Sequence, residues 1–325
     1  MDIISQLFPL EYYKSLLPLE YNSFESFVKV DFSKWDWSQL IPSENFKYEE
    51  GVTPFSNKNF IFMAIISYLL TVYTIKAAMS NSKLKGFSLG YVSAIHNLIL
   101  CGWSLVMVLG VAYDAYLIAT TTSHGINCIF CSPKSNPFSG RIFYWHYLYF
   151  ISKFYEFLDT IIIVLKKKPL IFLHIWHHSI VVLIVWTWLP EGIAYGNVGL
   201  FANTLVHVFM YYYYFRTSLN PSIRIWWKSY LTSGQLFQFT MSFILAIPFL
   251  VQDISYDKET GIVGHSCVGW GGFSFTMMNN LFFLILFMNF YIKTYLTGGA
   301  NKKGNTRGNT IRSSSSPSTS NKKVQ

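Results

Sequence analysis

The sequence predicts an all-α polytopic membrane protein with seven transmembrane helices, and two observations lead to that fold class. Of the 325 residues, 52% are hydrophobic and only 13% are charged, whereas an ordinary globular chain has about 25% charged residues. A bilayer span needs about 20 mainly apolar residues, and intervals of roughly that length recur along the chain. They cover residues 59–75, 86–113, 142–165, 169–190, 192–215, 229–252 and 260–292.

The third interval differs from the other six because charged residues interrupt it. It carries Lys153, Glu156 and Asp159. Ionisable side chains are expensive inside a bilayer and mark functional sites by default. On a helix, Lys153, Glu156 and Thr160 are expected to share one face, with Asp159 about 60° further round. A buried Lys153–Glu156 ion pair that merely holds the bundle together is the alternative interpretation.

Basic residues in alternate connections predict the orientation. The connections after the first, third and fifth intervals are basic, and so is the segment after the seventh. By the positive-inside rule these segments face the cytosol, so the C-terminus is cytosolic and the N-terminus lies across the membrane. We expect a luminal N-terminal segment (residues 1–55), a seven-helix transmembrane catalytic domain (residues 56–296) and a disordered cytosolic tail (residues 297–325).

The tail ends with two lysines, Lys322 and Lys323, at the fourth and third positions from the C-terminus. This ending resembles the dilysine retrieval signal of endoplasmic reticulum membrane proteins, and it predicts location in that membrane. A basic tail that binds anionic lipid is the alternative. The net charge of +9 is then an asymmetry between the two sides of the membrane, and no nucleic-acid partner is expected.

The cysteines are too few and too scattered for a disulfide framework. Cys128 and Cys131 form a CxxC in a connection, where a loop disulfide or two free thiols are favoured over a metal or redox site. The other two are Cys101 and Cys267.

Polar side chains recur at helical spacing in the fourth, fifth and sixth intervals. The fourth begins with three histidines in five residues, which packing alone does not easily explain. At 1.5 Å per residue, the polar motifs of four helices come to one level, roughly 13 Å below the cytosolic edge. We therefore expect one polar cluster there. It consists of His174, His177 and His178, of Asn203, His207 and Tyr211, of Gln235 and Gln238, and of Lys153, Glu156, Asp159 and Thr160.

A basic rim is expected above this cluster, and it suits a polyphosphate head group such as that of coenzyme A. Histidines can act as nucleophile or general base, and amide donors can stabilise an oxyanion or enolate. These residue types favour acyl transfer on a coenzyme A thioester. The rim consists of Lys166, Lys167, Lys168, Arg216, Arg224 and Lys228.

Two other classes of protein remain open at this point. Membrane desaturases and hydroxylases hold two irons in boxes of the same HxxHH type, but they need several such boxes, and this chain has one. A transporter could use the intramembrane charges as a proton or ligand site, but that function gives no reason for the basic rim.

Four motifs decide between these classes. They are Lys153-x-x-Glu156-x-x-Asp159-Thr160, His174-x-x-His177-His178, Asn203-x-x-x-His207-x-x-Met210-Tyr211 and Thr232-x-x-Gln235-x-x-Gln238. In identity, order and spacing they resemble the ELO family of very-long-chain fatty acid elongases, over roughly residues 56–296. The resemblance implies a 3-oxoacyl-CoA synthase that condenses acyl-CoA with malonyl-CoA and releases CO2 and coenzyme A. It also implies that six of the helices form a barrel around an acyl-chain tunnel, with no metal or other cofactor.

The resemblance assigns roles within the cluster. The catalytic candidates are His174, His177, His178 and His207, and the sequence leaves open whether His177 or His207 is the nucleophile. The other motif residues support them. The implied partners are the reductases and the dehydratase of the elongation cycle, and a homo-oligomer is possible. Trp186 and Trp188 could close the far end of the tunnel, although an interfacial aromatic belt is the favoured interpretation.

Overall fold

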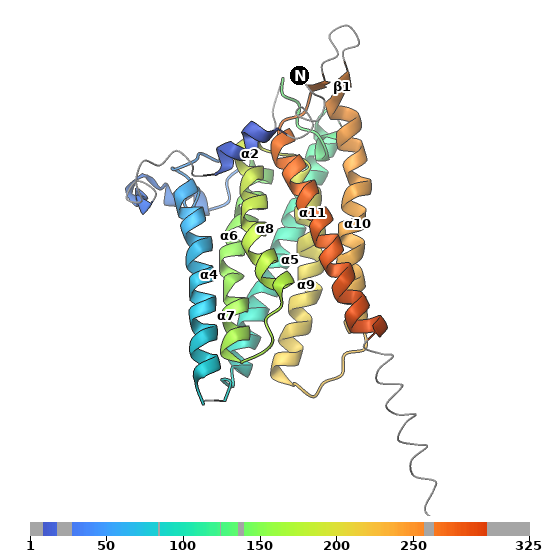
Figure 1. Ribbon diagram of the computed structural model, residues 1–325. Coiled ribbons are helices and arrows are strands. Elements are labelled where there is room, and N and C mark those ends of the chain that lie inside the picture. The colour runs from blue at the N-terminus through green and yellow to red at the C-terminus, as the bar shows by residue number, and fades with distance from the viewer. Residues whose placement is uncertain are drawn as a thin grey trace, which may run out of the picture.

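The computed structural model describes residues 9–17, 28–83, 85–123, 125–135, 140–256 and 263–297. The part of the chain so described is almost entirely helical, as predicted, and its long helices run side by side (Figure 1). One short antiparallel sheet joins β1 (Ile254–Tyr256) to β2 (Val263–His265). Lys322 and Lys323 lie outside the described residues. The helices are α2 (Leu10–Leu16), α4 (Lys58–Asn81), α5 (Gly90–Thr121), α6 (Arg141–Tyr155), α7 (Phe157–Leu165), α8 (Phe172–Glu191), α9 (Gly196–Leu219), α10 (Lys228–Asp253) and α11 (Trp270–Tyr291).

Five of these helices are long and apolar enough to cross a membrane, namely α4, α5, α8, α10 and α11 with its extension to Leu296. The chain is accordingly a multi-pass membrane protein, but the predicted count of seven spans is not confirmed. The third predicted span is divided at Glu156 into α6 and α7, each too short to cross alone. The fifth, α9, has 24 residues but includes Asn, Thr and His side chains and four consecutive tyrosines.

The hydrogen bonds change at the division between α6 and α7. The Glu156 amide still bonds the Ser152 carbonyl at 2.9 Å, but the next bond, from the Asp159 amide to the Glu156 carbonyl at 3.0 Å, follows the tighter three-residue pattern. Glu156 itself keeps helical dihedral angles.

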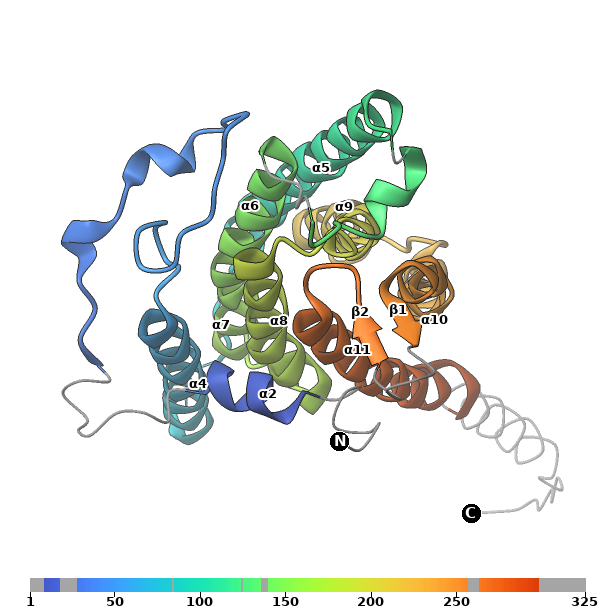
Figure 2. The same cartoon turned by 90° about the horizontal axis from the view of Figure 1, so that it is seen from above.

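Six helices follow one another around a common interior (Figure 2). Starting from α5, each packs against the next in the order α5, α6, α8, α11, α10, α9, and α9 returns to α5. Helix α4 lies outside this ring and packs chiefly against α7. The polar motifs of the sequence lie on α6 to α10, so this packing gathers them on the inside.

The bundle has two distinct ends. The basic end holds the connections 82–89, 166–171 and 220–227, and the hairpin end holds α2, β1 and β2 (Figure 1). At the hairpin end a disulfide joins Cys131 to Cys267, while Cys128 is free and buried, and its burial raises the pKa of the thiol. The prediction of a local disulfide or free thiols was therefore wrong for Cys131, because its partner is 136 residues away.

Candidate functional site

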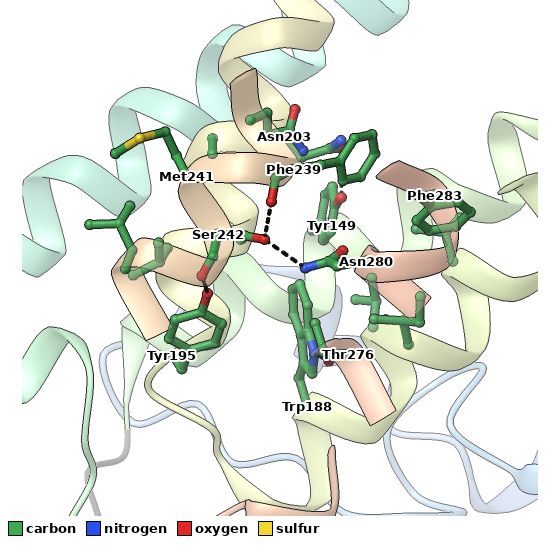
Figure 3. Close-up of a pocket in the computed structure, with 18 of the residues that line it drawn as sticks. Tyr149, Trp188, Tyr195, Asn203, Phe239, Met241, Ser242, Thr276, Asn280 and Phe283 are labelled. Carbon is green, nitrogen blue, oxygen red and sulfur yellow. Dashed lines mark hydrogen bonds between the residues drawn. The ribbon is translucent and has the colours of Figure 1, made fainter. Parts of the chain in front are cut away.

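A cavity of about 70 Å³ lies inside the ring, between α6, α8, α9, α10 and α11 (Figure 3). On α8 its wall consists of His177, Val181, Ile184, Val185 and Trp188, so it follows one face of that helix for about 16 Å. His177, Asn203 and Gln238 line the part of the cavity nearer the basic end, which we call the cavity head. Ser242, Thr276 and Asn280 add polar groups further along the wall, and the other lining side chains are mostly apolar.

The three histidines of α8 are brought together at this head. The ring of His178 lies 4.3 Å from that of His174 and 5.6 Å from that of His177. His174 Nε2 bonds the Thr160 hydroxyl at 2.8 Å, and Tyr68 of α4 bonds the same hydroxyl at 2.9 Å. His177 alone of the three lines the cavity. In the described structure its buried Nδ1 has no hydrogen-bond partner, so no protein contact fixes its tautomer.

A buried ion pair stands beside the cavity head. Lys153 donates to Glu156 Oε1 at 2.7 Å, with side chains 0% and 2% exposed. The ammonium also lies 4.0 Å from the centre of the Tyr149 ring, and the same carboxylate oxygen is 3.8 Å from His207 Nδ1. Tyr149 in turn donates to Asn203 Oδ1 at 2.6 Å. The pair thus links His207 to the cavity wall, and it is sealed from solvent.

Asp159 makes a separate connection. Its Oδ2 accepts from the Tyr211 hydroxyl at 2.9 Å, and its Oδ1 lies 2.8 Å from His96 Nε2 on α5. The Tyr211 ring lies 5.3 Å from that of His207. Lys153, Glu156 and Thr160, which were predicted to share one face, are all buried. Thr160 bonds side chains of α4 and α8, while Asp159 joins α5 to α9.

The two predicted glutamines separate. Gln238 lines the cavity, whereas the Gln235 amide contacts the sulfur of Met210 at 3.6 Å. Residues three apart on a helix differ by about 60° in direction, which is enough to place one inside the cavity and the other beside it.

All six predicted rim cations lie at the basic end. Lys166 is half-buried and bonds the Ser93 hydroxyl of α5, and burial, followed by repulsion from Lys168, lowers the pKa of Lys166. Lys167 bonds the Ser82 carbonyl at 3.1 Å. Arg216 bonds the Tyr212 hydroxyl at 3.1 Å. The side chains of Lys168, Arg224 and Lys228 are exposed and available to an anionic ligand.

The far end of the cavity is closed by aromatic rings. Trp188 is 5% exposed and donates from Nε1 to Thr276 Oγ1 at 2.9 Å, and its ring packs against the backbones of Gly196 and Gly199. Tyr195 donates to the Ser242 carbonyl beside it (Figure 3). Trp186 is equally buried. The interpretation of both tryptophans as an interfacial belt was therefore wrong.

Several site residues were not predicted. Tyr149 lies one helical turn before Lys153, and that spacing was a usable signal. His96 stands alone in an apolar interval, and its partner Asp159 is 63 residues away. Ser242 and Asn280 form a hydrogen-bonded pair in the cavity wall at 3.2 Å, and nothing in the sequence marks them. Among the described residues, no group of three or more His, Cys, Asp and Glu side chains could hold a metal ion.

Comparison with known proteins identifies the family. The model of the ELO (GNS1/SUR4) family matches residues 53–303. A putative fatty acid elongase of Dictyostelium discoideum is 40% identical over 274 residues, which are 84% of this chain and 88% of that protein. Fatty acid elongase A of the same organism is 36% identical over 282 residues, 84% of this chain and 97% of its own length. Very long chain fatty acid elongase 5 of Tachysurus fulvidraco is 33% identical over 224 residues, 66% of this chain and 71% of its own. Since the matched range contains all four motifs and every helix from α4 to α11, the chain belongs to the ELO family.

Proposed function

We propose that this chain is a fatty acid elongase that acts as a very-long-chain 3-oxoacyl-CoA synthase. It condenses a long-chain acyl-CoA with malonyl-CoA, and the products are 3-oxoacyl-CoA, CO2 and coenzyme A. One observation carries the proposal: a histidine lines a mainly apolar cavity inside the bundle, and exposed cations lie at the basic end. The apolar wall suits part of an acyl chain, the cavity head suits a thioester, and the cations suit the phosphates of coenzyme A.

The two candidate nucleophiles differ in their surroundings. His207 has a carboxylate oxygen 3.8 Å from Nδ1, beyond hydrogen-bond distance but near enough to favour a developing imidazolium through charge. His177 lines the cavity and has no such carboxylate. We therefore assign the nucleophile to His177 and the base to His207. His178 packs against the His177 ring and is itself held by His174.

The chemistry then follows in two steps. His177 attacks the acyl carbon, and the carbon–sulfur bond breaks with its electron pair on the coenzyme A sulfur. Malonyl-CoA next loses CO2, and the electron pair left on its C2 forms the new bond to the acyl carbon, which releases the histidine. In this proposal the side-chain amides of Asn203 and Gln238, which line the cavity, donate to the oxyanion and the enolate. No metal or other cofactor takes part in this proposal.

The disulfide supports the orientation. Disulfides form in the endoplasmic reticulum lumen and are rare on the cytosolic side, and Cys131–Cys267 lies at the hairpin end. The positive-inside rule independently assigns the basic end to the cytosol. We therefore propose an endoplasmic reticulum protein with a luminal hairpin end, a luminal N-terminus, and coenzyme A bound on the cytosolic side. The reductases and the dehydratase of the elongation cycle would act on its product.

Two measurements test the proposal. Purified protein with malonyl-CoA and a panel of acyl-CoAs should form 3-oxo products that mass spectrometry detects. A complete absence of product would favour a desaturase or a transporter instead. Intact-mass analysis after incubation with acyl-CoA alone should show one acyl adduct, which His177→Ala abolishes and His207→Ala retains at a slower rate of formation. The opposite pattern would reverse the assignment of the two histidines.

A further inference from the structure

The proposed reaction consumes one proton in each turnover. The malonyl carboxylate leaves as neutral CO2, its electron pair becomes the new carbon–carbon bond, and the pair of the broken carbon–sulfur bond ends on sulfur. Coenzyme A leaves as a thiol only if that sulfur receives a proton. The site is buried, so the proton needs a route from the basic end to the cavity head.

The two carboxylates of the third motif differ in their access to solvent. Glu156 is 2% exposed and its partner Lys153 is 0% exposed, so this pair cannot exchange protons readily with water. The Asp159 side chain is 16% exposed, eight times as much, although it lies only three residues further along. Of the two, Asp159 is therefore the less enclosed carboxylate.

Asp159 joins a hydrogen-bonded chain of three groups. His96 Nε2 is 2.8 Å from Oδ1, and the Tyr211 hydroxyl is 2.9 Å from Oδ2. At its inner end, the Tyr211 ring packs against His207. Both contacts have hydrogen-bond lengths along which protons transfer.

The outer end of the chain reaches the basic end of the bundle. Ser93, one helical turn before His96 on α5, bonds Lys166 of the rim, so His96 lies about 4.5 Å deeper along the helix axis than that contact. The buried Nδ1 of His96 has no hydrogen-bond partner in the described part of the chain. A histidine of this kind can take up a proton on one nitrogen and release one from the other.

We propose that His96, Asp159 and Tyr211 form a proton relay that supplies the proton consumed in each turnover. Tyr211 does not line the cavity, so its proton passes inward beside His207, whose ring it contacts, to the departing sulfur. Tyr211 regains a proton from Asp159, which is recharged through His96. His96 acts through Asp159 and is thus a positioning residue. The inference rests on the proposed function and adds to it a role for the second carboxylate and for a fifth histidine.

Other titratable groups face the relay and set the background for any pH measurement. Those near Asp159 are Tyr68 on α4, Tyr155 on α6, His174 on α8, Tyr211 and Tyr214 on α9, and the Lys153–Glu156 pair. Tyr155 packs on His96 and the other groups act through Asp159, so the pH profile of a His96 variant is compared with that of a control variant and with its response to imidazole.

Two variants separate proton transfer from a structural role. Gln at position 96 can keep a hydrogen bond to Asp159 but cannot carry a proton. We expect His96→Gln to lower kcat at least about tenfold, to leave the KM values unchanged, and to make the rate fall with rising pH. His96→Ala should lose a similar factor and regain it in part on addition of imidazole. A structural role predicts the reverse, namely an active His96→Gln and no rescue of His96→Ala.

His265→Gln is the matched control. His265 Nδ1 pairs with Asp253 Oδ2 at 2.7 Å at the hairpin end, so the His265→Gln substitution removes a similar histidine–carboxylate pair that lies away from the site. This variant should keep the wild-type pH profile, and imidazole should not change its activity. The relay is overturned if His96→Gln keeps the wild-type kcat and pH profile. It is also overturned if imidazole fails to restore activity to His96→Ala, or raises the activity of His265→Gln as well. A wild-type protein that forms no 3-oxo product would instead overturn the proposed function.

Discussion

Trp188 should set the longest acyl chain that the cavity accepts. Its indole closes the far end of the cavity, held by Thr276 and by two glycine backbones. Between Ile184 and Trp188 the α8 axis advances about 6 Å, which is room for roughly four methylenes at about 1.3 Å each. Trp188→Ala should therefore extend the preferred substrate by up to about four carbons.

The size of the effect follows from the burial of methylenes. Each buried methylene is worth about 0.8 kcal/mol, or about fourfold. The variant should gain about fifteenfold in kcat/KM for each two-carbon extension beyond the wild-type limit, until the new space is filled. The assay is the kcat/KM of purified protein for saturated acyl-CoAs of increasing length.

Trp186→Ala is the control for this measurement. Trp186 is on the same helix and is as buried as Trp188, 3% against 5% exposed, but it lines a different cavity near α2. Both variants should lose about 3–5 kcal/mol of stability. The reasoning is refuted if folded Trp188→Ala keeps the wild-type chain-length profile, or if Trp186→Ala shifts it equally.

Three further predictions concern the ion pair, the disulfide and the rim. Lys153→Met should destabilise the protein by about 3–5 kcal/mol because it leaves Glu156 buried and unpaired; adding Glu156→Gln should restore the melting temperature in detergent but not the product yield. Cys131→Ser, Cys267→Ser and the double variant should each lose the same stability, about 2–4 kcal/mol, and unequal losses would argue against the bond. Lys168→Ala and Arg224→Ala should each raise the KM for both coenzyme A substrates by about twofold to fivefold with kcat unchanged, and the effect should fade at high salt.

Much of the fold and of the site could be predicted from the sequence, since both depend on local periodicity and on the energetics of the bilayer. Apolar length predicted α4, α5, α8, α10 and α11 as spans, and spacing on α8 and α9 predicted that their histidines point to one interior. The disulfide and the His96–Asp159 contact could not be predicted, because each depends on how distant helices pack. A partner 63 or 136 residues away leaves no trace in one sequence.

Glu156 and Asp159 belong to one sequence motif but lie in two different environments, on either side of the division between α6 and α7. If α6 and α7 were one straight helix, Asp159 would lie about 60° from Glu156 and both carboxylates would compete for Lys153. In the structure Glu156 keeps the lysine, while Asp159 bonds His96 and Tyr211. The Ser152 hydroxyl also contacts Glu156 Oε1 at 3.4 Å, so Ser152→Ala should weaken the hold on Glu156 and slow the reaction although Ser152 itself does not line the cavity. An unchanged kcat in Ser152→Ala would mean that the contact of Lys153 alone holds Glu156 in place.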